Sequence, residues 1–159
     1  MITLIKICIL EPLNCLVGFD DTLIQVDASW AISYVTDSSD EHAEAVCSTT
    51  GMIDALMRHL SSKNDDKLIT PALRAVGNVI TGTDNHTQFC LEKGFLSCAA
   101  NLLSHRKKTI VKETCWALSN VTAGTRDQVN SVITHGLVPV IVGQLKSSDF
   151  RVQKVKNCH

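Results

Sequence analysis

Apolar residues recur along this chain with the spacing of helices rather than with the alternation of strands. The segment 95–103 places its apolar residues on one stripe, at i, i+3, i+6 and i+7: Leu96, Ala99, Leu102 and Leu103. The segment 109–122 holds a second apolar set, formed by Ile110, Val111, Cys115, Leu118 and Val121. Ahead of both, 84–93 predicts a short helix with Asp84 as its N-cap and Gly94 as a left-handed C-cap. The pattern therefore predicts a unit of three helices and an all-α chain.

This three-helix pattern repeats with a period of about 42 residues. The tripeptides that begin at Gly51, Gly94 and Gly136 are 43 and 42 residues apart, and Leu60, Leu103 and Leu145 keep the same intervals. The positions of Trp30, Arg74 and Trp116 are 44 and 42 residues apart, and each is followed by a stretch that contains threonine. Three landmarks that hold one period in one order indicate true internal repeats.

A period of about 40 to 47 residues with two or three helices per unit is typical of an armadillo or HEAT solenoid. The sequence therefore predicts one all-α, armadillo-type, right-handed solenoid over residues 1–159, with about three repeats of three helices. We assign a partial repeat to 1–39, full repeats to 40–82 and 83–124, and a truncated repeat to 125–159. No unit can bury its apolar face alone, so stacked neighbours must supply the core and both outer faces should expose apolar side chains.

The long third helix of each unit carries a pair of side chains at i and i+4, which places both on one face. The pairs, which we call the ladder, are Trp30 with Tyr34, Arg74 with Asn78, and Trp116 with Asn120. Carboxylates flank the ladder, because Asp27 precedes Trp30 by three residues, Glu113 precedes Trp116 by three, and Asp84 follows the Thr81-Gly-Thr83 turn. The sequence thus predicts a surface of aromatic, amide and acidic groups that repeats from unit to unit.

Such a ladder suits an extended basic peptide. Packed helices repeat about every 10 Å, and an extended chain advances about 3.3 Å per residue, so ladder and peptide can stay in step. Asparagine can hold the peptide backbone, while an indole face can hold the stem of a lysine or arginine whose charged end reaches a carboxylate. The alternative interpretation is that the tryptophans belong to the core and the carboxylates are solvated. The repetition would then reflect only the duplication of the unit.

Composition and charge narrow the classes of function. With 15 Lys and Arg against 16 Asp and Glu, the net charge is −1, and the longest run of like charge is Arg106–Lys108. We therefore expect no nucleic-acid partner. No uncharged apolar run reaches the length of a membrane span, and no catalytic motif of the common enzyme classes is present. We expect no membrane insertion, no enzyme activity and no cofactor.

The seven cysteines form no C-x-x-C pair and give an odd total, so they predict reduced thiols that serve as small core residues, not a metal site or a disulfide framework. The apolar start 1–10 is interrupted by Lys6 and lacks a cleavage pattern, which argues against a secretory signal. These features favour an intracellular location.

Four segments resemble the armadillo repeats of the importin α (karyopherin α) family, in the family's order. They are Trp30-Ala-Ile-Ser-Tyr-Val-Thr-Asp37, Ala72-Leu-Arg-Ala-Val-Gly-Asn-Val-Ile-Thr-Gly-Thr-Asp84, Trp116-Ala-Leu-Ser-Asn-Val-Thr-Ala-Gly124 and Asp149-Phe-Arg-Val-Gln-Lys154. The second segment is the most specific, because an arginine in place of the ladder tryptophan in the middle of the array is itself a feature of the family. The resemblance covers about residues 13–154 and implies an internal fragment around the middle repeats.

The resemblance implies an adaptor of nuclear import, present in cytoplasm and nucleus, that binds nuclear localisation signals in two grooves. By resemblance, Asp27, Trp30 and Tyr34 lie where the major groove ends. The minor groove would begin with Arg74, Asn78, Thr81, Asp84, Thr87, Glu113, Trp116 and Asn120. Arg74 would pair with groove carboxylates, Asp84 and Glu113 would receive lysine or arginine ends, Thr81 and Thr87 would give polar contacts, and Asn120 would hold the peptide main chain.

The chain also departs from the family pattern. The basic amino-terminal segment with which the family binds importin β is not in this sequence, so that partner is expected only for a longer form. Residues 1–12 match no family segment, and Cys158 stands where the family has a tryptophan. Two alternatives stay open: an armadillo scaffold of the β-catenin kind, which binds acidic or mixed segments, and a truncated solenoid without a partner.

Overall fold

The computed structural model describes residues 6–61, 63 and 65–146, and every regular element in those residues is helical. In chain order the elements are η1 (Lys6–Leu10), α2 (Glu11–Val17), α3 (Thr22–Thr36), α4 (Asp40–Cys47), α5 (Met52–His59), α6 (Asp66–Thr81), α7 (Asp84–Glu92), α8 (Phe95–Leu102), α9 (Lys108–Ala123), α10 (Arg126–Thr134) and α11 (Leu137–Lys146). The predicted all-α class is confirmed.

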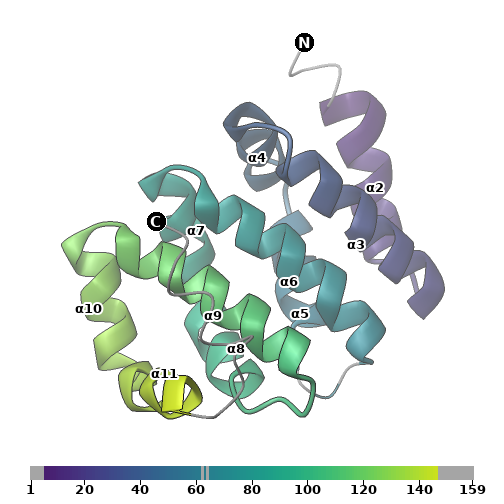
Figure 1. Ribbon diagram of the computed structural model, residues 1–159. Helices are drawn as coiled ribbons and strands as arrows, with labels where there is room; N and C mark the ends of the chain where they lie inside the picture. The colour runs from purple at the N-terminus through teal and green to yellow at the C-terminus, as the bar shows by residue number, and fades with distance from the viewer. Residues whose placement is uncertain (1–5, 62, 64, 147–159) are drawn as a thin grey trace.

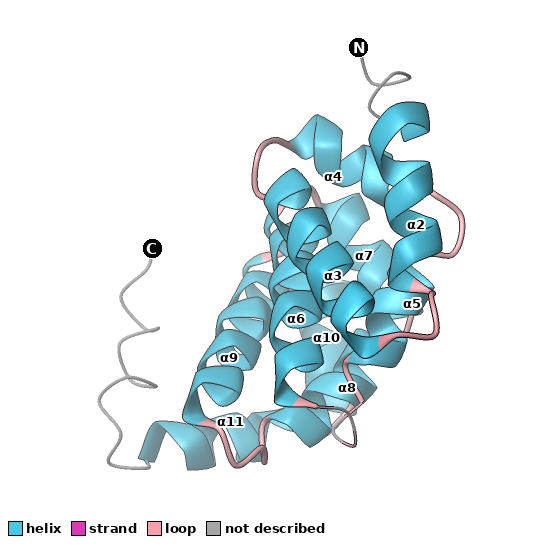
Figure 2. Cartoon of the chain, turned by 90° about the vertical axis from the view of Figure 1, so that its right-hand side faces the viewer, coloured by secondary structure: helices cyan, strands magenta, loops and turns pink. Residues whose placement is uncertain are grey.

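The helices stack as repeated units along one axis. Helices α4 to α6 form one three-helix unit, α7 to α9 form the next, α2 and α3 precede them, and α10 and α11 follow. Figure 1 shows the long helices α3, α6 and α9 side by side, all running in the same direction. Figure 2 shows that these three form one layer, with the shorter helices α2, α5 and α8 on one side of it. The repeat starts assigned at 40, 83 and 125 fall at, or one residue before, the first residues of α4, α7 and α10.

The helices of the second unit lie where the apolar pattern placed them, within a residue or two at each end. Gly94 has φ of 89°, and Gly51 and Gly136 also have positive φ, so the turn between the first and second helices is the same in each unit. The last 13 residues of the truncated repeat, 147–159, lie outside the described residues, and with them the resemblance at 149–154 and Cys158.

The predicted N-cap of α7 is wrong by one residue. Thr83 caps the helix, since its hydroxyl accepts a hydrogen bond from the backbone N–H of His86 at 3.3 Å, and Nδ1 of His86 accepts one from the N–H of Thr83 at 3.3 Å. Thr83 has the extended backbone that a cap requires, with φ −74° and ψ 161°. Asp84 is already helical, and its carboxylate instead sits at the positive end of the helix dipole.

Helix α10 begins with the same kind of capping box, formed by Thr125 and Gln128, and the last residue of each box, His86 or Gln128, also ties its unit to the preceding one. Nε2 of His86 lies 2.8 Å from Oε2 of Glu44 in α4, and Nε2 of Gln128 donates to the backbone oxygen of Asp84 at 2.8 Å. One continuous set of buried apolar residues runs through the stacked units, from Leu10 to Leu137. Neighbouring units therefore share their core, as a solenoid requires.

A buried carboxylate joins the third helix of one unit to the loop that precedes the third helix of the next unit. Asp66, at the first turn of α6, has a side chain only 8% exposed and meets three basic groups from the α8–α9 loop: His105 at 3.2 Å, Arg106 at 3.1 Å and Lys107 at 3.1 Å. Burial by itself raises the pKa of Asp66, but hydrogen bonds and charge from Lys107 and Arg106 outweigh burial and hold that pKa below its usual value.

A lowered carboxyl pKa makes stability depend on pH. The stabilisation from ionised Asp66 should be fully present above its unfolded pKa of about 4 and should be lost as the pH falls toward the lowered value. We therefore expect Asp66→Asn to be less stable than the parent chain at neutral pH, and the difference to shrink below about pH 4 in urea unfolding. Asp127→Asn, at an exposed carboxylate, is the control. A difference that stays constant from neutral to acid pH would contradict this role.

The two outer faces of the stack expose apolar side chains, as predicted. Leu16, Phe19 and Leu23 are exposed beside α2 and α3, and Ile133, Val138 and Val142 are exposed on α10 and α11. Buried apolar surface contributes about 25 cal/mol per Å², so these faces favour association between chains.

We expect the isolated chain to associate in a concentration-dependent way, measured by light scattering, and the double variant Phe19→Ser with Leu23→Ser to shift it toward monomer. Tyr34→Ser, which removes an exposed aromatic ring from the ladder instead, should leave association unchanged. A parent chain that stays monomeric at all concentrations would show this expectation to be wrong.

Candidate ligand-binding face of the third helices

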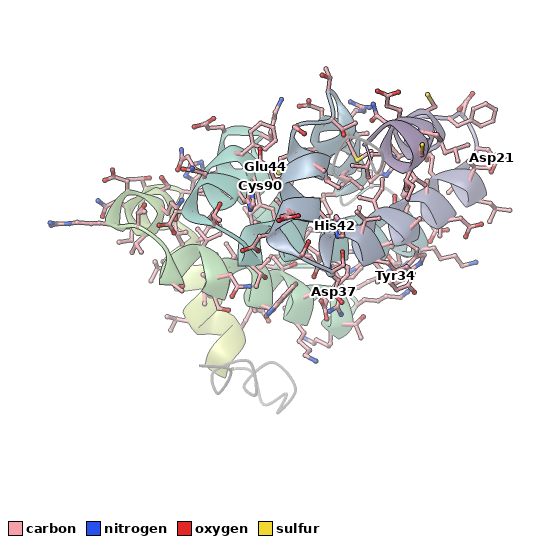
Figure 3. All side chains as sticks on the ribbon, turned by 90° about the horizontal axis from the view of Figure 1, so that it is seen from above. Asp21, Tyr34, Asp37, His42, Glu44 and Cys90 are labelled. Carbon is pink, nitrogen blue, oxygen red and sulfur yellow. The ribbon has the colours of Figure 1, made fainter. Side chains whose placement is uncertain are left out.

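The ladder residues lie on α3, α6 and α9, the three helices that form the front layer in Figure 1. On α3, the rings of Trp30 and Tyr34 stack with centroids 6.2 Å apart and an interplanar angle of 26°. Tyr34 is exposed, Trp30 is half-buried, and Asp27 is exposed one turn earlier on the same helix. Figure 3 shows Tyr34 and Asp37 on the same side of the molecule. The i, i+4 pair therefore forms an aromatic platform open to solvent.

Arg74, Glu113 and Trp116 form the central contact between α6 and α9. Nη2 of Arg74 lies 2.9 Å from Oε1 of Glu113, and the guanidinium carbon lies 5.5 Å from the centroid of the Trp116 ring. Oε2 of Glu113 is buried and has no hydrogen-bond partner among the described residues. The cluster therefore holds one guanidinium between a carboxylate and an indole.

Gly77 sets the position of Trp116. A Cβ atom at Gly77 would lie 2.5 Å from Cζ3 of the Trp116 ring, which is closer than any real contact. Because glycine removes that obstruction, the indole lies directly against α6, and Trp116 stays in line with Arg74. A glycine in mid-helix lowers helix stability by about 1 kcal/mol relative to alanine. The packing of the ring against α6 offsets this loss.

We expect Gly77→Ala to displace the Trp116 ring and to weaken binding of a Lys/Arg peptide by about 0.5 to 2 kcal/mol, the size of one cation–π contact. Trp116 fluorescence, recorded in a Trp30→Phe background, should shift toward that of an exposed indole. Gly143→Ala is the matched control, because Gly143 is also helical but a Cβ there meets nothing within 4 Å. An unchanged spectrum and affinity in Gly77→Ala would refute the proposed role of the glycine.

Both ladder asparagines reach back to the preceding third helix. Nδ2 of Asn120 donates to the hydroxyl of Thr81 at 2.9 Å, and Nδ2 of Asn78 donates to the backbone oxygen of Ser33 at 3.0 Å. Asn120 is half-buried, whereas Asn78 is buried, with 8% of its surface exposed. The two asparagines occupy equivalent positions of their helices. Asn120 and its partner Thr81 are more exposed than Asn78.

The two remaining predicted residues have different surroundings. Thr87 is buried, and its hydroxyl donates to the backbone oxygen of Ile80 at 2.9 Å. Its hydroxyl therefore serves the contact between α6 and α7 in this conformation. Asp84 is exposed, and its Oδ1 would lie 3.4 Å from a Cβ at Gly124, beside the end of α9.

Two further carboxylates, Asp37 and Asp40, belong to this surface and were missed in the sequence. They line a hollow of about 160 Å³ together with three predicted residues, Asn78, Thr81 and Trp116. Asp40 is the first residue of α4, and Asp84, 44 residues later, is the first residue of α7. The internal repeat could therefore have predicted Asp40 from Asp84.

We call Asp37, Asp40 and Asp84 the acidic edge. They lie beside the carboxyl-terminal ends of the third helices, and Asp40 and Asp84 also begin α4 and α7. The three carboxylates favour cations at this edge.

Two cysteines, Cys47 and Cys90, are unreactive thiols. Burial, with a smaller contribution from Glu44, raises the pKa of Cys47 to about 12, and burial raises the pKa of Cys90. Both thiols are therefore protonated at neutral pH and are poor nucleophiles. Within residues 6–61, 63 and 65–146, no three candidate ligand side chains gather to hold a metal ion, and no helix is long and apolar enough to cross a membrane.

Comparison with known proteins agrees with this geometry. The model of the Armadillo/beta-catenin-like repeat matches residues 83–123. Importin subunit alpha-1a of Oryza sativa subsp. japonica is 38% identical over 88% of this chain, and importin subunit alpha-3 of Arabidopsis thaliana is 41% identical over 67% of it. The chain belongs to the importin α family of armadillo-repeat proteins. It spans only 26% and 20% of the length of these two importin α relatives.

Solved structures show the same fold. A designed armadillo repeat protein in complex with the peptide (KR)4 superposes with a TM-score of 0.90 at 25% identity, covering 96% of this chain and 63% of the designed one. An engineered protein gives a TM-score of 0.85 at 26% identity, over 91% of this chain and 58% of that one. The armadillo-type solenoid predicted from the repeat, and seen in this importin α chain, is therefore confirmed.

Proposed function

We propose that the face formed by α3, α6 and α9 binds basic linear peptides of the nuclear-localisation type, without catalysis or cofactor. The observation that carries the proposal is internal: the guanidinium of Arg74 lies between the Trp116 indole and the Glu113 carboxylate. An arginine of this chain thus makes the contact that a ligand arginine or lysine would make elsewhere along the same ladder.

Two places on the face offer that chemistry to a ligand. At the first, Trp30 and Tyr34 supply an aromatic platform, and Asp27 supplies a carboxylate one turn away. At the second, the hollow of the acidic edge sets Asp37 and Asp40 beside Trp116. A lysine or arginine stem would lie on the ring while its charged end meets the carboxylate.

The main chain of the ligand would be held between these places. Oδ1 of Asn120 carries no hydrogen bond to a described residue, so it can accept one from a peptide N–H. The repeat spacing of about 10 Å corresponds to about three residues of extended chain. One peptide can therefore place basic side chains on successive helices. Thr81 and Asp84 extend the polar rim of this site.

The comparisons support this class of ligand. The designed armadillo repeat protein is in complex with the peptide (KR)4, and the relatives are importin subunits. We therefore propose a segment of a nuclear import adaptor that acts in cytoplasm and nucleus. Contact with importin β is proposed only for a longer form of the chain.

A titration with charge variants tests the proposal. A labelled Lys/Arg peptide is titrated against the parent chain, Glu113→Ala and the double variant Asp37→Asn with Asp40→Asn, with Glu92→Ala on α7 as the control. Glu113→Ala should weaken binding, because Arg74 then remains as an unneutralised cation within the site. The double variant should also weaken binding and flatten the dependence on salt.

Equal affinity across all of these variants would remove the proposed site. If a peptide rich in Asp and Glu bound this face more tightly than the basic one, the β-catenin type of scaffold would be the better description. If neither peptide bound, the chain would be a solenoid without a peptide ligand.

A further inference from the structure

The opposite ends of α6 and α9 carry a second charged surface that the proposed function does not use. The α5–α6 and α8–α9 loops and the first five residues of α6 and α9 hold six basic side chains against two carboxylates, Asp65 and Asp66. We call the six the basic edge: Lys63, Lys67, Arg106, Lys107, Lys108 and Lys112. The whole chain has a net charge of −1, so this edge concentrates positive charge against the overall balance.

Most of this positive charge is not neutralised within the protein. Arg106 and Lys107 share a single carboxylate, that of Asp66, and their own side chains remain 82% and 51% exposed. Lys63, Lys67, Lys108 and Lys112 are exposed and form no ion pair with any residue that the structure describes. The unpaired ammonium groups are therefore available to an anionic partner.

The basic edge also has a concave part that joins two repeats. Lys63 from the α5–α6 loop and Arg106 from the α8–α9 loop line one hollow of about 540 Å³, together with Asn101, Ser104, His105 and the carboxylate of Asp66, with which Arg106 already pairs. Lys63 lines a neighbouring hollow of about 540 Å³ as well, beside α5 and α8. Polar donors and two cations from adjacent repeats thus converge on one recess.

We propose that the basic edge binds an acidic linear segment of a partner protein, independently of the peptide on the third-helix face. The loops of adjacent repeats lie about 10 Å apart, and alternate side chains of an extended peptide share one face at about 6.6 Å intervals, so carboxylates two or four residues apart would meet successive loops. A nucleic acid fits less well, because no phenylalanine, tyrosine or tryptophan lines the recess for a base to stack on.

The two surfaces are far enough apart to act separately. Helices α6 and α9 have 16 residues each, and a helix of that length spans about 24 Å. This exceeds the screening length of about 8 Å at physiological salt. The basic edge lies at the amino-terminal ends of these helices, and the acidic edge lies at their carboxyl-terminal ends.

A fluorescence anisotropy titration with the full chain tests the inference. The probe is a labelled peptide of about ten residues with Asp or Glu at every second position, which places these side chains on one face of an extended chain, and a peptide with Gln at those positions is its control. Saturable binding is expected with the acidic peptide and not with the Gln peptide. Affinity should fall several-fold between about 50 and 200 mM salt.

Matched variants locate the site. Lys63→Glu and Lys108→Glu should each weaken binding about threefold to fivefold, and about tenfold together. Arg126→Glu is the control, because Arg126 is the first residue of α10 as Lys108 is of α9, and both are exposed. Trp116→Ala should leave acidic-peptide binding unchanged, which separates this result from that of the proposed function.

Three outcomes would overturn the inference. The first is no saturable binding of the acidic peptide by the parent chain. The second is equal weakening by Arg126→Glu and Lys108→Glu, which would indicate a general charge effect. The third is tighter binding of a single-stranded oligonucleotide of similar charge, which would assign the basic edge to nucleic acid instead.

Discussion

Replacing both ladder tryptophans, Trp30→Ala with Trp116→Ala, is expected to weaken binding of a Lys/Arg peptide by about 1 to 4 kcal/mol. The estimate takes about 0.5 to 2 kcal/mol for each aromatic contact with a cation, and about 1.4 kcal/mol corresponds to a tenfold change in affinity. Trp30 and Trp116 are half-buried on different helices, so their contributions should add. Calorimetric titration measures the change.

The matched control is the pair Trp30→Phe with Trp116→Phe. Phenylalanine keeps an aromatic face at each position, so a smaller loss is expected than for alanine. The Trp116→Ala change also removes the ring that stacks on Arg74, at 5.5 Å, which leaves that guanidinium with Glu113 alone. If the double alanine variant bound the peptide as tightly as the parent chain, the ladder would have no part in binding.

Removing the Phe95 ring is expected to lower the free energy of unfolding by about 3 to 5 kcal/mol, the usual cost of Phe→Ala in a core. Phe95 is fully buried, and it is the first residue of α8, directly after the left-handed turn at Gly94. A loss of this size is a large part of the stability of an ordinary domain, which is about 5 to 15 kcal/mol. Urea unfolding followed by circular dichroism measures it.

Phe89→Ala provides the comparison, because Phe89 is half-buried on α7 and packs at the margin of the same core. Its cost should be clearly smaller, and Phe19→Ala, at an exposed ring, should cost little. In a solenoid each unit contacts only its neighbours, so the Phe95→Ala variant should unfold first in α7 to α9. Equal costs for Phe95 and Phe89 would contradict the burial on which this expectation depends.

Local patterns predicted the helices and their turns well. The apolar stripe at 95–103 and the glycine at 94 are local signals, since helical spacing and left-handed φ are properties of a few neighbouring residues. The cap at Thr83 was missed because Thr83 and Asp84 are both good cap residues in sequence. Only the backbone angles decide which of them precedes the first helical residue.

The candidate site was predicted in part. Helical spacing was enough to pair Trp30 with Tyr34, because an i, i+4 contact lies within one helix. A salt bridge from Arg74 to groove carboxylates was expected from the family resemblance, but the contact of Arg74 with Trp116 was not, and it depends on the space that Gly77 leaves on α6. The burial of Asn78 and Thr87 depends on helices from other units, which the spacing within one unit does not report.

The sequence by itself determined the solenoid, because a fixed period of helices with one apolar face can bury that face only by stacking. It also determined which residues share the ladder face. The tertiary structure alone decided which polar groups on that face are used internally and which carboxylates join it. It also brought the loops of two repeats together into the basic edge. These outcomes depend on distances between side chains about 40 residues apart, and such distances exist only once neighbouring units have packed.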